Sequence, residues 1–126
     1  MNIITAIGNT KFNEKLKNIE NINVIGKDIQ YKEGIIEVLE LFPNINLIFL
    51  SDILPGMIDN KELILKIKKI NKEIEIVYFF DKKKEEMENF LISEEINKIY
   101  YFENFDIEEF FANFLNKKEE LLNRNN

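Results

Sequence analysis

The sequence predicts one α/β domain with a five-stranded parallel sheet and helices on both faces. Five short apolar segments alternate with five segments whose apolar residues recur at helical spacing. The connections are short, and each strand–helix unit takes roughly 25 residues, which is typical of right-handed crossovers between parallel strands. The middle segment, 45–50, is apolar almost throughout, as expected of a strand that is covered on both faces.

The first half of the chain carries three of the predicted strands, at 3–7, 23–28 and 45–50. The first helix follows a cap at Asn9 or Thr10, and its apolar residues are Phe12, Leu16 and Ile19. The second helix ends at Pro43, and its inward face carries Ile35, Val38, Leu39 and Phe42.

The second half adds two strands, at 74–80 and 99–102, and three helices. The helix over 82–95 is charged and has a narrow apolar stripe. Asp106 and Glu109 form a capping box at the start of the last helix. We expect a domain over 1–115, with 116–126 either extending the last helix or forming a linker.

Five such units favour the flavodoxin-like strand order 2-1-3-4-5, a three-layer sandwich. In this order the first and third strands are central neighbours. Ligand sites of such sheets lie where the strand order reverses, at the carboxyl ends of these two strands.

Composition excludes several classes of chemistry. The chain contains no Cys and no His, so a Ser-His-Asp triad, a Cys nucleophile, a structural zinc site and disulfides are excluded. The net charge of −6 argues against binding to nucleic acid or to anionic membranes. No transmembrane run or signal peptide is found, so we expect a cytoplasmic protein. We also expect that the protein is not an enzyme and needs no cofactor.

The segment Leu47-Ile48-Phe49-Leu50-Ser51-Asp52-Ile53-Leu54-Pro55-Gly56 resembles the third strand and following loop of CheY-like response-regulator receiver domains. In that family the strand ends in a phospho-accepting Asp, with a Pro four positions later. Counting back from Pro55 gives Ser51 rather than Asp52. The resemblance implies a Mg²⁺ site built on two further acids after the first strand, a Ser/Thr after the fourth strand and a Lys after the fifth.

This chain departs from the receiver pattern at each of these positions. Gly8 and Asn9 replace the acidic pair, Ser51 stands at the acceptor position, Phe80 replaces the Ser/Thr, and Glu103 replaces the Lys. Glu103 would repel phosphate. The resemblance therefore implies a pseudo-receiver that has neither the phosphorylation switch nor a metal site.

Three alternatives stay open from the residues. A one-residue shift would make Asp52 a phosphoacceptor with Asp81 nearby, whereas the simpler interpretation is that Ser51 and Asp52 solvate and cap the loop. The Lys82-Lys83-Lys84 run forms a solvated face or a binding patch. A small ligand would bind in the crevice at the carboxyl ends of the central strands, where the loop after Gly8 would present N–H groups to an anion.

A receiver fold that lacks the phosphorylation site still has the surfaces through which receivers bind other proteins. The resemblance implies a protein-binding face built from the last two helices and the fifth strand, serving a homodimer or a fused domain. Candidate contact residues are Phe90, Tyr100, Tyr101, Phe110, Phe111 and Phe114; alternatively, these rings, Tyr100 included, only pack in the core. The segments 4–9 and 26–31 are also similar to the receiver-like N-terminal region of some MinD/ParA-type P-loop ATPases, which implies that an ATPase domain follows Asn126.

Overall fold

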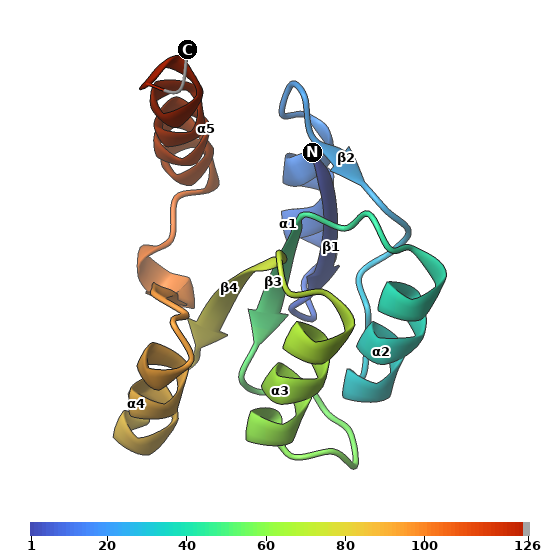
Figure 1. Ribbon diagram of the computed structural model, residues 1–126. Helices are drawn as coiled ribbons and strands as arrows, with labels where there is room; N and C mark the ends of the chain where they lie inside the picture. Colours follow the sequence, from blue (N-terminus) through green and yellow to red (C-terminus); the bar gives the residue numbers. More distant parts are fainter. Residues whose placement is uncertain (125–126) are drawn as a thin grey trace.

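The computed structural model describes the backbone of residues 1–124 and the side chains of residues 1–9 and 11–115. Strands and helices alternate along the chain as predicted (Figure 1). In order they are β1 (Asn2–Ala6), α1 (Thr10–Lys17), β2 (Asn23–Val24), α2 (Lys32–Leu41), β3 (Leu47–Ser51), α3 (Asn60–Ile70), β4 (Glu75–Phe80), α4 (Glu85–Ser93), β5 (Lys98–Tyr101), the 3₁₀ turn η1 (Phe102–Asn104) and α5 (Ile107–Arg124).

The sheet has the order β2-β1-β3-β4-β5, and all of its strands are parallel. This confirms the predicted topology. Ile3 of β1 pairs with Val24 of β2 on one side and with Leu47 of β3 on the other. β2 is shorter than predicted because the chain leaves the sheet at Gly26, which has a positive φ of 68°.

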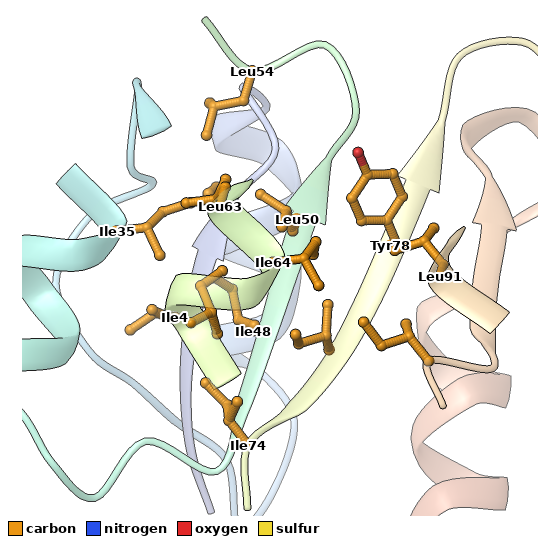
Figure 2. Packing of buried hydrophobic residues seen from close by; sticks show 14 of the residues in the cluster. Ile4, Ile35, Ile48, Leu50, Leu54, Leu63, Ile64, Ile74, Tyr78 and Leu91 are labelled. Atoms are coloured by element: carbon orange, nitrogen blue, oxygen red, sulfur yellow. The ribbon is translucent and has the colours of Figure 1, made fainter. Parts of the chain in front are cut away.

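Side chains of the central strands alternate between two hydrophobic cores, as the pleat of a strand requires. One core lies under α2, α3 and α4 and includes Ile4, Ile48, Leu50 and Tyr78 (Figure 2). The other core lies under α1 and α5 and includes Ile3, Leu47, Phe49 and Phe79. All five residues of β3 are buried, as expected of a strand with helices on both sides.

Phenylalanine dominates the core under α1 and α5. The Phe49 ring is fully buried at the centre of a group of aromatic rings. Its neighbours within 6.3 Å between centroids are Phe12, Phe79, Phe105, Phe110 and Phe111. The high Phe content of the last helix therefore fills this core.

The side chains of Asn9 and Asp106 cap the first turns of α1 and α5. Asn9 Oδ1 accepts hydrogen bonds from the backbone N–H groups of Lys11 and Phe12. Asp106 Oδ1 accepts from those of Glu108 and Glu109. α5 continues to Arg124 and so runs through residues 116–124, part of the segment expected either to extend the last helix or to form a linker. Within residues 1–124, no helix has the combination of length and apolar character needed to cross a bilayer.

Replacing Phe49 with Ala should lower the free energy of unfolding by about 3–5 kcal/mol, because the change removes a buried ring and leaves a cavity among the surrounding rings. Urea denaturation measures this loss. Phe42→Ala is the matched control, since Phe42 is about half exposed at the end of α2, and it should cost less than about 1 kcal/mol. Equal losses for the two variants would contradict this assignment of the core.

Candidate functional site

The candidate site lies at the carboxyl edge of the sheet, where β3 and β4 end side by side. Ser51 is paired with Phe79, and the backbone N–H of Asp52 donates to the Phe79 carbonyl at 2.9 Å. The β3–β4 pairing therefore extends one residue past the end of β3. It places the Asp52 side chain on the same face of the sheet as Leu50 and Tyr78.

Asp52 is the buried centre of a group of polar side chains. Its carboxylate side chain is 2% exposed. Oδ1 accepts a hydrogen bond from the Tyr78 hydroxyl at 2.6 Å and one from Asn60 Nδ2 at 3.2 Å. Oδ2 accepts from the ammonium group of Lys84, which also lies 3.4 Å from Asp81 Oδ1. We call these five residues, Asp52, Asn60, Tyr78, Asp81 and Lys84, the Asp52 cluster.

Four different elements position the cluster. Tyr78 points from the middle of β4 with its hydroxyl toward the loops at the end of the sheet (Figure 2). Asn60 is the first residue of α3, and its side chain also donates to the backbone carbonyl of Asp52 at 3.0 Å. Lys84 directly precedes α4 in an extended conformation that turns its side chain toward β3. The Asp52 carboxylate thereby connects β4, α3 and α4.

The electrostatics favour the charged pair. Burial raises the pKa of Tyr78 well above its usual range, and its hydrogen bond to Asp52 adds to this effect, so the hydroxyl stays protonated and donates. The hydrogen bond to Asp52 raises the pKa of Lys84 above its ordinary value, so its ammonium group stays charged at neutral pH. With two carboxylates and one ammonium group, the cluster carries a formal charge of −1 and would repel an anion.

The interpretation that Asp52 solvates and caps the loop is wrong, because this carboxylate is buried and ion-paired. Ser51 does match that interpretation, since its hydroxyl accepts a hydrogen bond from the Ile53 N–H at 3.2 Å. The interpretation of the lysine run as only a solvated face is wrong for Lys84, whose ammonium group bonds to Asp52. The spacing in the sequence bears only on the second contact of Lys84, because Asp81 lies three residues before it.

The remaining predicted site residues do not join the cluster. Gly8 and Asn9 are exposed after β1, and Glu103 is exposed in η1. Phe80 is fully buried against Tyr78 and Tyr101. Phe80 is thus part of the core, whereas the Glu103 carboxylate faces solvent.

Asp28 also lies at the carboxyl edge of the sheet, and the sequence analysis did not identify it. Its carboxylate accepts hydrogen bonds from the backbone N–H groups of Ile7 and Gly8 at 3.0 and 2.8 Å, and from Gln30 Nε2 at 3.2 Å. The amides of Ile7 and Gly8 are therefore already bonded, so Gly8 does not present a free N–H group to an anion. For the rest of that loop the expected anion contact stays a prediction.

The predicted interface aromatics divide into two groups. Phe110, Phe111 and Phe114 are buried in the core under α1 and α5, so they are not surface contact residues, and their prediction as such is wrong. Phe90, Tyr100 and Tyr101 are half-buried. For Tyr100, burial raises the pKa above its ordinary value.

A hollow with a volume of about 650 Å³ lies between α1 and the start of α5. Phe12, Lys15 and Phe105 contribute to its lining, and no residue of the Asp52 cluster does. Among residues whose side chains the structure describes, no three acidic residues are grouped closely enough to hold a metal ion.

Comparison with known proteins gives structural matches alone: no family model and no curated protein matches the sequence. RcsB from Salmonella enterica serovar Typhimurium, solved bound to promoter rprA, superposes with a TM-score of 0.76 at 20% identity, over 89% of this chain and 66% of RcsB. A LuxR-family DNA-binding response regulator from Staphylococcus aureus gives 0.71 at 18% identity, over 92% of this chain and 96% of the other.

A response regulator from Burkholderia pseudomallei, solved with a phosphorylated aspartic acid, gives a TM-score of 0.68 at 14% identity, over 97% of this chain and 74% of the other. The chain has the receiver fold. It spans 66% of the RcsB chain described above and 52% of the chain in another RcsB structure, which is less than two thirds of each. At these identities the likeness concerns the fold.

We predict an energetic coupling between Asp52 and Lys84 on the order of 1–2 kcal/mol in the free energy of unfolding, because removing Lys84 leaves the buried Asp52 charge without its cationic partner. A double-mutant cycle of Asp52→Asn and Lys84→Met, followed by urea denaturation at neutral pH, measures it. The raised pKa of Lys84 means that its contribution is present below the ordinary value of 10.5 and is lost as the pH rises through the raised value.

The matched control is Lys61 and Glu86, an ion pair that also joins α3 to α4 but lies on the surface at 2.8 Å. The same cycle there should give less than about 1 kcal/mol. A coupling at Asp52 that is no larger than this control would show that the buried pair does not hold the edge of the sheet together.

Proposed function

We propose that this chain is a pseudo-receiver: a regulatory domain with the receiver fold that works by binding protein and takes up no phosphoryl group. The observation that carries the proposal is the occupied carboxylate of Asp52. Both of its oxygens accept hydrogen bonds, and one of them is bonded to an ammonium group.

Phosphoryl transfer to a carboxylate requires an oxygen that the phosphorus can approach, together with positive charge to offset the incoming group. The Asp52 side chain is almost wholly covered, and Lys84 already neutralises it. Opening the ion pair would leave a buried charge without a partner, which is unfavourable. Glu103 adds negative charge at the position where the receiver pattern has a lysine.

The face formed by α4 and β5 supports the protein-binding part of the proposal. β5 lies at the edge of the sheet and, within the described residues, pairs with β4 alone. Lys61 of α3 lies over the Phe90 ring of α4, and the next residue of α4, Leu91, is buried. At about 100° per helical residue, Ile92 then lies on the side away from α3, and it is about half exposed. Ile92 and Tyr101 are therefore apolar contacts beside an open strand edge.

The proposal includes the cytoplasmic location expected from the sequence and a place beside a P-loop ATPase domain in a longer protein. The latter rests on the resemblance of segments 4–9 and 26–31 to ATPases with receiver-like N-terminal regions. A Walker motif in the coding sequence beyond Asn126 would support it.

Incubation with acetyl phosphate and Mg²⁺ should leave the mass of the protein unchanged, because Lys84 and Tyr78 occupy the Asp52 carboxylate. Intact-mass spectrometry measures this. The same incubation of the Lys84→Met variant extends the test, because this change frees Oδ2 of Asp52 from its ammonium partner. A gain of one phosphoryl group by the unaltered protein, lost in Asp52→Asn but kept in Ser51→Ala, would overturn the proposal in favour of an Asp52 phosphoacceptor.

Ile92→Ser and Tyr101→Ser should each weaken self-association by about tenfold or more if α4 and β5 form the contact, since apolar anchors near the centre of an interface dominate its energy. Sedimentation over a range of protein concentrations measures the dissociation constant. Leu65→Ser is the matched control, because Leu65 is about half exposed on α3. A chain that is monomeric throughout, or equal effects of all three variants, would count against this face as a homodimer contact.

A further inference from the structure

The hollow between α1 and the start of α5 is a site that the proposed function does not use. Its volume of about 650 Å³ falls in the range of roughly 300–1,000 Å³ that is usual for pockets that bind small molecules. Its described lining includes no residue of the Asp52 cluster, of α4 or of β5. We call it the α1–α5 hollow, and define it by three rings and three charged side chains of its lining: Phe12, Phe102, Phe105, Lys15, Asp106 and Glu108.

The three phenylalanine rings form an apolar floor, and the core holds each of them in place. Phe102 stacks on Phe79 with ring centroids 5.1 Å apart, and Phe105 meets the same Phe79 ring edge-on at 4.8 Å. Phe12 packs against Phe49 at 5.1 Å. All three rings of the floor are only half-buried. Because the core fixes these rings beforehand, an aromatic ligand can pack on them with little loss of side-chain freedom.

The two sides of the hollow carry opposite charge. α1 has three lysines and one glutamate, whereas residues 102–109 have three glutamates, one aspartate and no lysine. In the lining, Lys15 supplies the charge on the α1 side, and Asp106 and Glu108 supply it on the α5 side. The hollow therefore offers a cation to an acidic group and carboxylates to an amino group.

These three charged groups are available to a ligand. Lys15 and Glu108 are exposed, and among the residues whose side chains are described neither has an ion-pair partner. Asp106 is held in place because its Oδ1 atom caps α5, and within the described part of the chain its Oδ2 atom accepts no hydrogen bond. Opposite charges that line one hollow without pairing can each bond to a molecule that lies between them.

We propose that the α1–α5 hollow binds a small zwitterion that carries a flat ring, such as an aromatic amino acid. The ring packs on the three phenylalanines. The acidic group bonds to the Lys15 ammonium group, and the amino group bonds to the carboxylates of Asp106 and Glu108. A plain amine would leave Lys15 facing a second cation, and a plain acid would face two carboxylates, so a ligand with both groups fits best. The inference holds whether or not the face of α4 and β5 binds protein.

Four probes test this ligand class: phenylalanine, phenethylamine without the acidic group, 3-phenylpropionate without the amino group, and alanine without the ring. In an NMR titration of the labelled domain, phenylalanine should shift the backbone amides of residues 9–19 and 102–108. We expect a dissociation constant on the order of 1 mM for a ligand of this size. The amine and the acid should each bind about threefold more weakly, the effect of one exposed ion pair. Alanine should bind at least about tenfold more weakly, because it buries no ring.

Two variants separate the charged sides of the hollow. Lys15→Met should weaken the binding of phenylalanine and of phenylpropionate by about threefold, and it should not weaken that of phenethylamine. Glu108→Gln should weaken the binding of phenylalanine and of phenethylamine by a similar factor, and it should not weaken that of phenylpropionate. This crossed pattern requires that the two ends of the ligand bond to the two sides of the hollow.

Matched controls distinguish these local contacts from the general charge of the domain. Lys17→Met removes the same charge two residues further along α1, and Glu103→Gln removes the same charge in η1, and neither residue is part of the lining. Neither change should alter the affinity for any probe by more than about twofold, the usual effect of an exposed site. All four substituted side chains are exposed, so thermal unfolding should show that each variant folds.

The inference is overturned if phenylalanine shifts no amide of these two segments, or if alanine, the amine or the acid binds as tightly as phenylalanine. It is also overturned if the controls weaken binding as much as Lys15→Met and Glu108→Gln do. Shifts centred on Asp52 and Tyr78 would place the ligand at the ends of the central strands instead and would contradict the proposal. Sedimentation without ligand tests another occupant: self-association that both Lys15→Met and Glu108→Gln abolish would make a second copy of this chain the occupant and overturn it.

Discussion

A carboxylate that is buried at the end of a sheet strand is unfavourable unless it is paired. Asp52, which directly follows β3, is such a carboxylate. The surrounding elements meet this constraint: β4 contributes the Tyr78 hydroxyl, α3 begins with Asn60, and the loop before α4 turns Lys84 inward. The positions of α3 and α4 on the sheet are thus tied to one carboxylate. The same contacts engage both oxygens of the carboxylate, which supports the proposal that it takes up no phosphoryl group.

The sequence predicted the fold well because the fold depends on local patterns. Continuous apolar runs indicated buried parallel strands, and helical spacing indicated the covering helices; both are read within a short window. β2 was predicted too long because the turn at Gly26 and the bonding of Asp28 to the end of β1 depend on contacts between distant segments. Such contacts leave no periodic signal.

The site was less predictable for the same reason. Asp52 and Lys84 are 32 positions apart, and Lys84 is the last of three consecutive lysines. Composition cannot tell which of the three turns inward, because that is decided by where α4 begins. The phenylalanines of α5 show the reverse case. Their number suggested an exposed surface, but Phe49 and Phe79 offer a deep aromatic core that accepts Phe110, Phe111 and Phe114.

The order of the strands also affects how the chain reaches its structure during synthesis. β1 is made first, but its pairing with β3 joins Ile3 to Leu47. The centre of the sheet therefore waits until the third strand has left the ribosome, while β4 and β5 then add one after the other to an existing edge. Contacts between distant residues close slowly. From the synthesis of β1 until β3 has been completed at Ser51, the nascent chain holds an apolar strand without its central neighbour, and that interval is when it most needs protection from aggregation.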